Sequence, residues 1–391
     1  MTKRVVCSVL VVVLALLSPA TAHAQDGGMQ WSGPPVAASS ADTQPCADVM
    51  FLAARGSLED GPYGSMVTSW RDALATATQQ MPGRGIGTVR EVFVDYPAIG
   101  PDTMLDAGLE GLFFSEELPA LPYRESVTTG VEAARHALTD SAERCPAERW
   151  VLVGYSQGAQ VMTEVLAERT EQDSGQLLLA LLLGNPAHYQ GQSLTEPSGD
   201  ADDLAGGLTA ALYYIRHEAA AGRQAGGQPQ ATADGVRAIL ELSQGKANSE
   251  AMAEAARGAG FELPAALRSQ VLSLCNAGDV VCDSGGLLRK VVIEGAGIDG
   301  LVDDSWDAHH AYGPKDAAVV VDRISAELRA LVPPTPAEPG IRTGPLDPRL
   351  ILAGGVAIVL LTGLAVSLVM LWRAPSRQTR SAADRSGPAQ P

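Results

Sequence analysis

Residues 150–168 read W-V-L-V-G-Y-S-Q-G-A-Q-V-M-T-E-V-L-A-E, and this stretch decides the fold. A short apolar run comes first and is followed by G-Y-S-Q-G at residues 154–158. Apolar residues then recur four positions apart, as a helix that packs on a sheet requires (Val161 and Val165, Met162 and Leu166). The stretch therefore predicts a strand, a sharp turn and a helix, with Ser156 at the turn.

The two glycines around Ser156 have a steric explanation. In G-x-S-x-G the chain turns so tightly that side chains two residues before and after the serine would collide with neighbouring backbone. The turn lifts the serine above the sheet, where we expect the backbone amide of Gln157, at the helix N-terminus, to stabilise an oxyanion. A chance match is the alternative, since the chain has 41 glycines in 391 residues. The strand before and the helix after favour a nucleophilic serine.

Apolar runs and helical periodicity extend this pattern along the chain. The runs predict strands at residues 47–54, 89–96, 151–153, 176–183 and 270–274. The periodicity predicts helices at residues 62–81, 126–142 and 314–331. Strands that are apolar on both faces and alternate with helices indicate an α/β fold, with a mainly parallel sheet between two helical layers. In such sheets the reactive residues gather at the carboxyl ends of the strands.

Residues 185–269 form an insertion that is longer than an ordinary crossover needs. The segment contains helix-like pieces at residues 204–221, 234–242, 249–257 and 264–269. It leaves from the carboxyl end of the strand at 176–183, so it begins on the side of the sheet where the reactive residues lie. Two interpretations stay open, a mobile lid or substrate-shaping flap, and a structural decoration.

The two ends of the chain carry secretion and membrane signals. Residues 1–24 combine a basic start, an apolar core and an A-x-A motif, which predicts a cleaved signal peptide, with an uncleaved anchor as the alternative. Residues 350–372 are free of charge and are followed by the basic tail 373–391, which predicts a transmembrane helix with a cytoplasmic tail. We therefore expect a single-pass cell-membrane protein whose catalytic domain is extracytoplasmic.

Two segments of low complexity border the predicted catalytic domain at residues 46–332. Residues 25–45 precede the first expected strand and read as a linker. Residues 333–349 are rich in proline and predict an extended stalk that holds the domain away from the membrane.

The formal net charge of −17 argues against nucleic acid and against anionic lipid headgroups as partners. Cys7 leaves with the signal peptide, so four of the five cysteines remain for an oxidising compartment. Three pairings are possible in principle, but the short separation of Cys275 and Cys282 favours a bond between them and leaves Cys46 for Cys145. The C-x6-C spacing without partnered histidines disfavours zinc. We expect no metal, no other cofactor and a monomer.

A serine nucleophile needs a base and an orienting carboxylate, and after a strand-turn-helix nucleophile the order is serine, acid, histidine. Asp279 stands out as the acid because it lies in the short segment C-N-A-G-D-V-V-C at residues 275–282, although most aspartates are solvent-facing turn residues. His309 and His310 are the histidines that follow it.

Four blocks of this sequence together resemble the cutinase family of serine esterases. They are C-A-D-V with R-G-S at residues 46–49 and 55–57, G-Y-S-Q-G at 154–158, C-N-A-G-D-V-V-C at 275–282, and H-H-A-Y-G at 309–313. The resemblance covers residue 46 to about residue 186 and then residues 272–331. The insertion and the predicted membrane anchor depart from the compact, secreted members of that family.

The resemblance implies an α/β-hydrolase-like, three-layer α/β/α sandwich with a serine triad. Ser156 would be the nucleophile, Asp279 the acid and His309 the base, since Tyr312 completes the H-x-x-Y-G register from His309. The oxyanion hole would come from Ser57 and Gln157. The family pattern also implies disulfides between Cys46 and Cys145 and between Cys275 and Cys282.

These observations predict an extracytoplasmic serine ester hydrolase that acts on acyl or lipid esters near the membrane. One alternative is a phospholipase or an esterase of envelope glycolipids. An alternative from another class is a hydrolase-like scaffold that binds an envelope partner without catalysis.

Overall fold

The structure is a computed structural model, and it describes residues 27–79, 86–189, 192, 206–296, 303–315 and 318–331. The chain separates into two units, Met1–Thr335 and Pro336–Pro391, and every element named below belongs to the first. The predicted signal peptide (1–24), stalk (333–349), membrane span (350–372) and basic tail (373–391) lie outside the described residues. Within the described ranges, no helix combines the length and apolar character needed to cross a bilayer.

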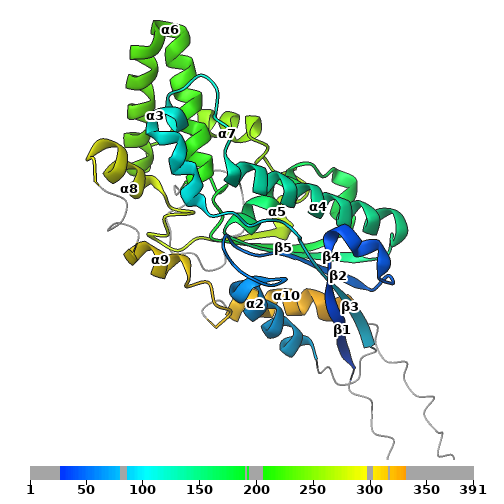
Figure 1. Cartoon of the computed structure of the whole chain (residues 1–391). Coiled ribbons are helices and arrows are strands. Elements are labelled where there is room, and N and C mark those ends of the chain that lie inside the picture. Colours follow the sequence, from blue (N-terminus) through cyan, green and yellow to red (C-terminus); the bar gives the residue numbers. More distant parts are fainter. Residues whose placement is uncertain are drawn as a thin grey trace, which may run out of the picture. The chain divides into compact units, whose positions relative to one another are not determined.

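The described residues contain one sheet of six parallel strands, in the order β1-β3-β2-β4-β5-β6 (Figure 1). The strands are β1 (Gly28–Ala37), β2 (Val49–Ala54), β3 (Ile86–Phe93), β4 (Arg149–Tyr155), β5 (Leu177–Leu183) and β6 (Val271–Leu274). All residues of β2, β5 and β6 are buried, as a parallel sheet covered on both faces requires. The five predicted strands and their parallel arrangement are confirmed.

Four helices cover the two faces of the sheet. They are α2 (Gly64–Thr78), α4 (Pro122–Arg144), α5 (Gln157–Ala167) and α10 (Ala318–Leu331). Side chains of α4 and α5 pack with Met50 and Leu52 of β2, whereas those of α2 and α10 pack with Phe51 and Ala53. Alternate residues of one strand thus face different helical layers, and the predicted three-layer α/β/α arrangement is present.

The described part of the insertion contains the helices α6 (Leu208–Ser243) and α7 (Ser249–Gly258). Helix α6 is interrupted at Gly226 and Gly227, where Gly227 has a φ of +73°, and its two arms lie side by side in Figure 1. The predicted helical pieces at 204–221, 234–242 and 249–257 correspond to these helices. The predicted piece at 264–269 is wrong, because this region holds turns and the 3₁₀-helix η4 (Arg268–Gln270).

Short helices make up much of the remaining connections in the described ranges. Before β4 they are η1 (Ala38–Thr43), η2 (Pro101–Ala107) and α3 (Gly108–Phe113), and η3 (Glu171–Gly175) precedes β5. After β6 they are α8 (Gly285–Leu288), the π-helix η5 (Arg289–Ile293) and α9 (Asp303–His309).

The structure corrects the expectation of a linker at residues 25–45, because residues 28–43 form β1 and η1. Strand β1 pairs along β3, and its register shifts between Ser32 and Val36, where two prolines interrupt the ladder, as is typical of prolines in an edge strand. Trp31 anchors the strand, since its indole N–H donates to Thr78 Oγ1 over 3.1 Å and its ring lies 5.3 Å from that of Phe51. Backbone pairing at a sheet edge and one aromatic anchor thus outweigh a low-complexity composition.

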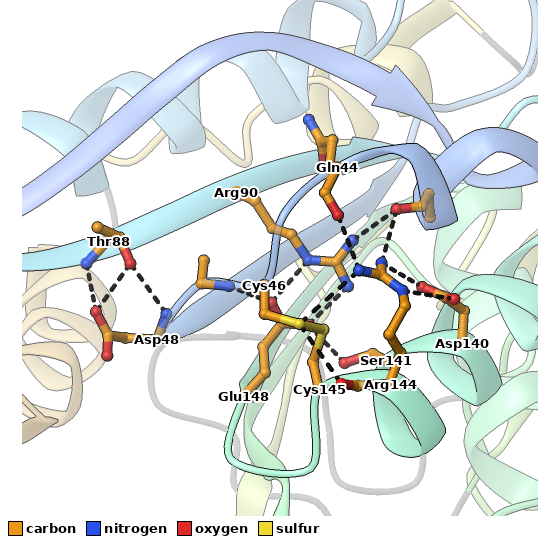
Figure 2. Close-up of a disulfide and its surroundings, with 12 residues drawn as sticks. Gln44, Cys46, Asp48, Thr88, Arg90, Asp140, Ser141, Arg144, Cys145 and Glu148 are labelled. Atoms are coloured by element: carbon orange, nitrogen blue, oxygen red, sulfur yellow. Dashed lines mark hydrogen bonds and ion pairs between the residues drawn. A yellow bond between two sulfur atoms is a disulfide. The ribbon is translucent and has the colours of Figure 1, made fainter.

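A buried ion pair connects β3 to the residue that precedes β4. Arg90 of β3 donates through Nε and Nη2 to the two carboxylate oxygens of Glu148, over 2.7 and 2.6 Å, and both side chains are almost fully buried (Figure 2). Ser141 Oγ and the Ala47 N–H also donate to Glu148, over 2.6 and 3.0 Å. Each carboxylate oxygen therefore has two partners, which is the condition under which a buried charge is tolerated.

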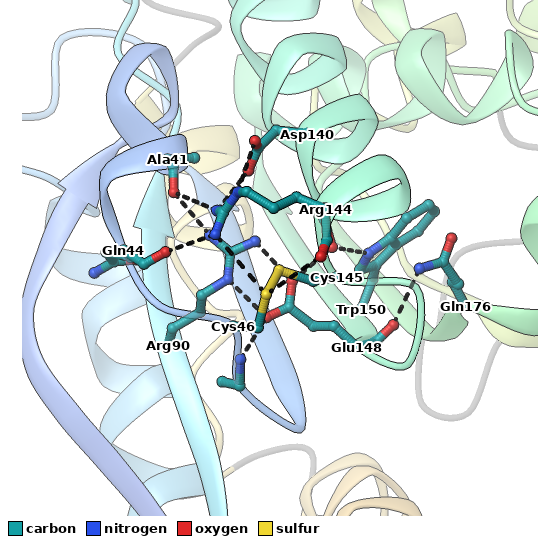
Figure 3. A network of polar contacts seen from close by, with 12 residues as sticks. Ala41, Gln44, Cys46, Arg90, Asp140, Arg144, Cys145, Glu148, Trp150 and Gln176 are labelled. Carbon is teal, nitrogen blue, oxygen red and sulfur yellow. Dashed lines mark hydrogen bonds and ion pairs between the residues drawn. A yellow bond between two sulfur atoms is a disulfide. The ribbon is translucent and has the colours of Figure 1, made fainter.

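The same region contains the longer disulfide. Cys46 and Cys145 are bonded, with their Cα atoms 5.6 Å apart, as predicted. Arg144, next to Cys145, donates to the carbonyl oxygens of Ala41 and Gln44 over 3.2 and 2.9 Å (Figure 3). The disulfide and these hydrogen bonds attach the connection between η1 and β2 to the end of α4.

Candidate active site

The predicted strand, turn and helix are present around Ser156. Strand β4 ends at Tyr155 and α5 begins at Gln157, and Ser156 between them has a φ of +53° and a ψ of −121°. A β-carbon at Gly154 would lie 2.5 Å from the carbonyl oxygen of Gly158, and one at Gly158 would lie 2.2 Å from that of Ala54. Both distances are shorter than any real contact, so the two glycines permit the turn that presents Ser156.

Asp279 and His309 are hydrogen-bonded to each other. The Nδ1 atom of His309 lies 2.9 Å from both carboxylate oxygens of Asp279, and the exposed fractions of the two side chains are 2 % and 0 %. The Val281 N–H donates to Asp279 Oδ1 over 2.8 Å, and the Tyr312 hydroxyl donates to Oδ2 over 2.5 Å. The predicted disulfide between Cys275 and Cys282 closes the loop that carries Asp279. Three hydrogen-bond donors and a loop closed by a disulfide thus hold this carboxylate in one position.

Tyr312 is itself fixed. The Asn276 N–H donates to its hydroxyl oxygen over 2.9 Å, and the indole N–H of Trp70 donates to its carbonyl oxygen over 2.6 Å. Burial, and next the negative charge of Asp279, raise the pKa of Tyr312 well above its ordinary value. The hydroxyl therefore keeps its proton and remains a donor to Asp279.

The imidazole of His309 lies between aromatic rings and the backbone of a glycine. The Tyr155 ring stacks on it with centroids 5.0 Å apart, and the Tyr155 hydroxyl donates to the His309 carbonyl oxygen over 3.1 Å. Gly184, at the end of β5, has a φ of +56°, and a β-carbon there would lie 2.8 Å from His309 Cε1. His310 is exposed and stacks on Trp306. Of the two histidines, His309 is therefore the one aligned with Asp279.

Ser156, His309 and Ser57 line one cavity of about 1060 Å³. The cavity lies at the carboxyl ends of the strands, because Ser156 follows β4 directly and Ser57 lies in the loop that follows β2. Gln157 is fully buried, and its side-chain amide donates to the Ile99 carbonyl oxygen over 3.1 Å. Its backbone N–H is one of the first four of α5, which have no acceptor within their own helix.

Glu59 shapes the loop that carries Ser57. Its carboxylate accepts hydrogen bonds from the N–H groups of Gly56 and Ser65, both over 2.8 Å, and from the Ser65 hydroxyl over 2.9 Å. Leu58 takes the left-handed conformation, with a φ of +61°, and its N–H donates to the Ala98 carbonyl oxygen over 2.8 Å. The loop between β2 and α2 is therefore fixed at both ends.

Several residues that position the site could not be identified from the sequence patterns. Asn276 lies inside a motif that was recognised, and its side-chain amide donates to the Ala308 carbonyl oxygen over 2.9 Å, which connects the loop that carries Asp279 to the end of α9. Tyr155 also lies inside a recognised motif, but its partner His309 lies 154 residues further along the chain. Glu59 and Gly184 lie outside the recognised motifs, and they act through backbone contacts that a sequence pattern does not reveal.

Comparison with known proteins places this architecture in a family. The family model for cutinase matches residues 45–292. Carboxylesterase Culp1 of Mycobacterium tuberculosis is 30 % identical over 128 residues, which are 33 % of this chain and 46 % of that protein. A cutinase of Hypocrea jecorina is 26 % identical over 149 residues, 38 % of this chain and 50 % of that protein.

The chain thus spans about half the length of these curated relatives. Among solved structures, the catalytic core domain of an acetyl xylan esterase from Trichoderma reesei aligns with 19 % identity and a TM-score of 0.40, covering 72 % of this chain and 100 % of that one. The family match extends over more than half of the residues, and the chain belongs to the cutinase family.

Proposed function

We propose that this protein is a serine carboxylesterase that hydrolyses acyl or lipid esters through an acyl-enzyme. The observation that carries the proposal is the hydrogen bond between Asp279 and His309, in the wall of the cavity that Ser156 also lines. Membership of the cutinase family supports it, because the matched relatives are named as esterases or cutinases.

In this mechanism, Ser156 Oγ attacks the ester carbonyl carbon while Nε2 of His309 removes its proton. Asp279, which faces Nδ1, keeps the imidazole in the reactive tautomer and stabilises the imidazolium that forms. The backbone N–H of Gln157 and the groups of Ser57 bind the oxyanion of the tetrahedral intermediate.

The intermediate collapses when the protonated His309 donates its proton to the leaving alcohol, and the acyl group remains on Ser156. A water molecule then attacks the acyl carbon and gives its proton to His309. The second tetrahedral intermediate releases the carboxylic acid, and the proton returns to the oxygen of Ser156.

The proposal places the catalytic domain on the outer side of the cell membrane. Two disulfides support this location, because such bonds persist in oxidising compartments. The signal-like residues 1–24 and the apolar residues 350–372 agree with it. A tethered enzyme meets the esters within reach of its stalk, so acyl and lipid esters of the cell surface are the proposed substrates.

Hydrolysis of p-nitrophenyl butyrate by the full chain tests this function. We expect Ser156→Ala to lower kcat/KM by about a thousandfold or more. The control is Ser249→Ala, an exposed serine of α7, which we expect to keep wild-type activity. Equal inactivity of wild type and Ser156→Ala, without labelling of Ser156 by a serine-directed phosphonate, would instead favour a non-catalytic scaffold.

A further inference from the structure

The insertion contributes to the wall of the cavity that holds Ser156. Leu208 and Leu212, both in the first turns of α6, line it. Next to them the wall is formed by Leu112 of α3, by Leu288 of α8 and by Val292 of η5. These side chains have no polar atoms, so this part of the cavity, here called the apolar chamber, favours a hydrocarbon group.

Hydrogen bonds join the start of α6 to the segment that carries the catalytic acid. The Leu208 N–H donates to the Val281 carbonyl oxygen over 2.8 Å, two residues beyond Asp279. The Ser284 hydroxyl and N–H donate to the Gly206 carbonyl oxygen over 2.8 and 2.9 Å. The start of α6, which forms part of the chamber wall, is therefore fixed to the segment that follows Asp279.

A second set of contacts joins α6 to α3. Arg216 donates to the Leu112 carbonyl oxygen over 2.7 Å, and Arg223 donates to that of Phe114 over 2.5 Å. The second arm of α6 packs closely there, because a β-carbon at Gly235 would lie 2.7 Å from the Phe114 ring. Arginine side chains that bind the last carbonyl groups of a helix stabilise that helix end. The chamber is thus preformed by these contacts.

The charges around the cavity disfavour an anionic substrate. Among its lining residues in the described ranges, the acidic side chains are Glu59 and Asp102, and lysine and arginine are absent. The whole chain also has a formal net charge of −17. A phosphate group bound near the reacting ester would meet two carboxylates without a compensating cation.

We infer that the site takes neutral esters of long-chain fatty acids, an inference that rests on the esterase function proposed above. The acyl chain occupies the apolar chamber built by α3, α6, α8 and η5, the ester carbonyl lies at Ser156, and the uncharged alcohol points to solvent. Leu58, 77 % exposed, also lines the cavity and extends its apolar surface outward. Of the ester classes considered above, this assignment favours neutral acyl lipids over phospholipids.

The apolar chamber is tested by measuring the hydrolysis of p-nitrophenyl esters from acetate to palmitate by the full-length protein at a fixed detergent concentration. We expect kcat/KM to rise with chain length by up to about fourfold per methylene, because each added methylene is buried. Leu212→Trp and Val292→Trp, which fill the chamber from two different segments, should each lower the ratio of palmitate to butyrate turnover at least about tenfold. Ile293→Trp alters an exposed neighbour outside the cavity lining and should keep the wild-type ratio.

A second pair of substrates tests whether the cavity disfavours an anionic group. 1-Palmitoylglycerol and its 3-phosphate share the acyl chain and the ester bond and differ by the phosphate group. We expect kcat/KM for the neutral ester to be higher by about tenfold or more. If the acyl ester of the 3-phosphate is hydrolysed as fast as that of 1-palmitoylglycerol, or faster, the assignment of neutral esters is overturned and a phospholipase is favoured.

The tests separate this inference from the function on which it rests. Butyrate hydrolysis that depends on Ser156, combined with ratios that neither tryptophan variant changes, would overturn the chamber and leave the esterase in place. A wild-type preference for acetate over palmitate would have the same meaning. If no ester is hydrolysed and a short alkyl phosphonate does not label Ser156, the proposed function itself fails.

Discussion

His309, the proposed general base, is positioned partly by the absence of a side chain at Gly184. A β-carbon there would lie 2.8 and 2.9 Å from Cε1 and Nδ1 of His309, and the φ of +56° already disfavours other residues. We expect Gly184→Ala to displace the imidazole and to lower kcat/KM for p-nitrophenyl butyrate about a hundredfold. Esterase assays together with urea unfolding measure the two effects separately.

The matched control is Gly260→Ala. Gly260 has a φ of +79°, but a β-carbon there would meet nothing within 4 Å. Both variants should lose about 1–2 kcal/mol of stability through the left-handed backbone, and only Gly184→Ala should lose activity. Equal activity of the two variants would show that the close approach to His309 does not matter.

At the residue scale, short motifs predict the proposed catalytic residues better than they predict the residues that hold those side chains in position. Ser156, Asp279 and His309 lie in short sequence blocks, and the structure brings Asp279 and His309 into hydrogen-bond contact beside the cavity that Ser156 lines. Gly184 and Tyr155 could not be predicted, because their contacts with His309 bridge more than a hundred residues of chain.

At the scale of elements, periodicity predicted the buried strands and the helices that cover them. It failed for β1, whose low-complexity sequence suggested a linker, because an edge strand pairs through backbone N–H and C=O groups that do not depend on an apolar pattern of side chains. It also could not show that α6 lines the cavity. That follows from contacts with α3 and with residues 281–284, which lie far from it in the sequence.

The ion pair between Arg90 and Glu148 connects β3 to the start of β4 and belongs to this scale (Figure 3). Arg90→Met leaves a buried carboxylate without its cation, so we expect the free energy of unfolding to fall by about 3–5 kcal/mol. The double variant Arg90→Met, Glu148→Leu removes the unpaired charge and should recover part of that loss. Urea unfolding of the single and double variants measures it.

A surface pair supplies the control for this prediction. Arg135 and Glu168 make a similar two-point contact, but both side chains are 41 % exposed. Arg135→Met should therefore cost only about 0–1 kcal/mol. A comparable loss for Arg90→Met and Arg135→Met would contradict the importance of burial.

At the scale of the whole molecule, the tyrosines set the behaviour in alkali. The sequence has eight, all of them in the described residues, and burial raises the pKa of each, that of Tyr214 to about 12. Below about pH 10 both the folded and the unfolded chain keep these protons, so the contribution to stability is fully present. As the pH rises from about 10 toward the raised values, the unfolded chain releases protons that the folded chain retains.

Stability must therefore fall with rising pH in this window, by about 1.4 kcal/mol per pH unit for each tyrosine that ionises only after unfolding. Urea unfolding at pH 8, 10 and 11 should show midpoints that decrease steeply above pH 10. Tyrosinate absorbance at 295 nm should appear together with the loss of helical circular dichroism, whereas the chain in concentrated urea should titrate near pH 10. Tyrosinate that forms while the helices remain intact would show that these hydroxyl groups are accessible in the folded protein.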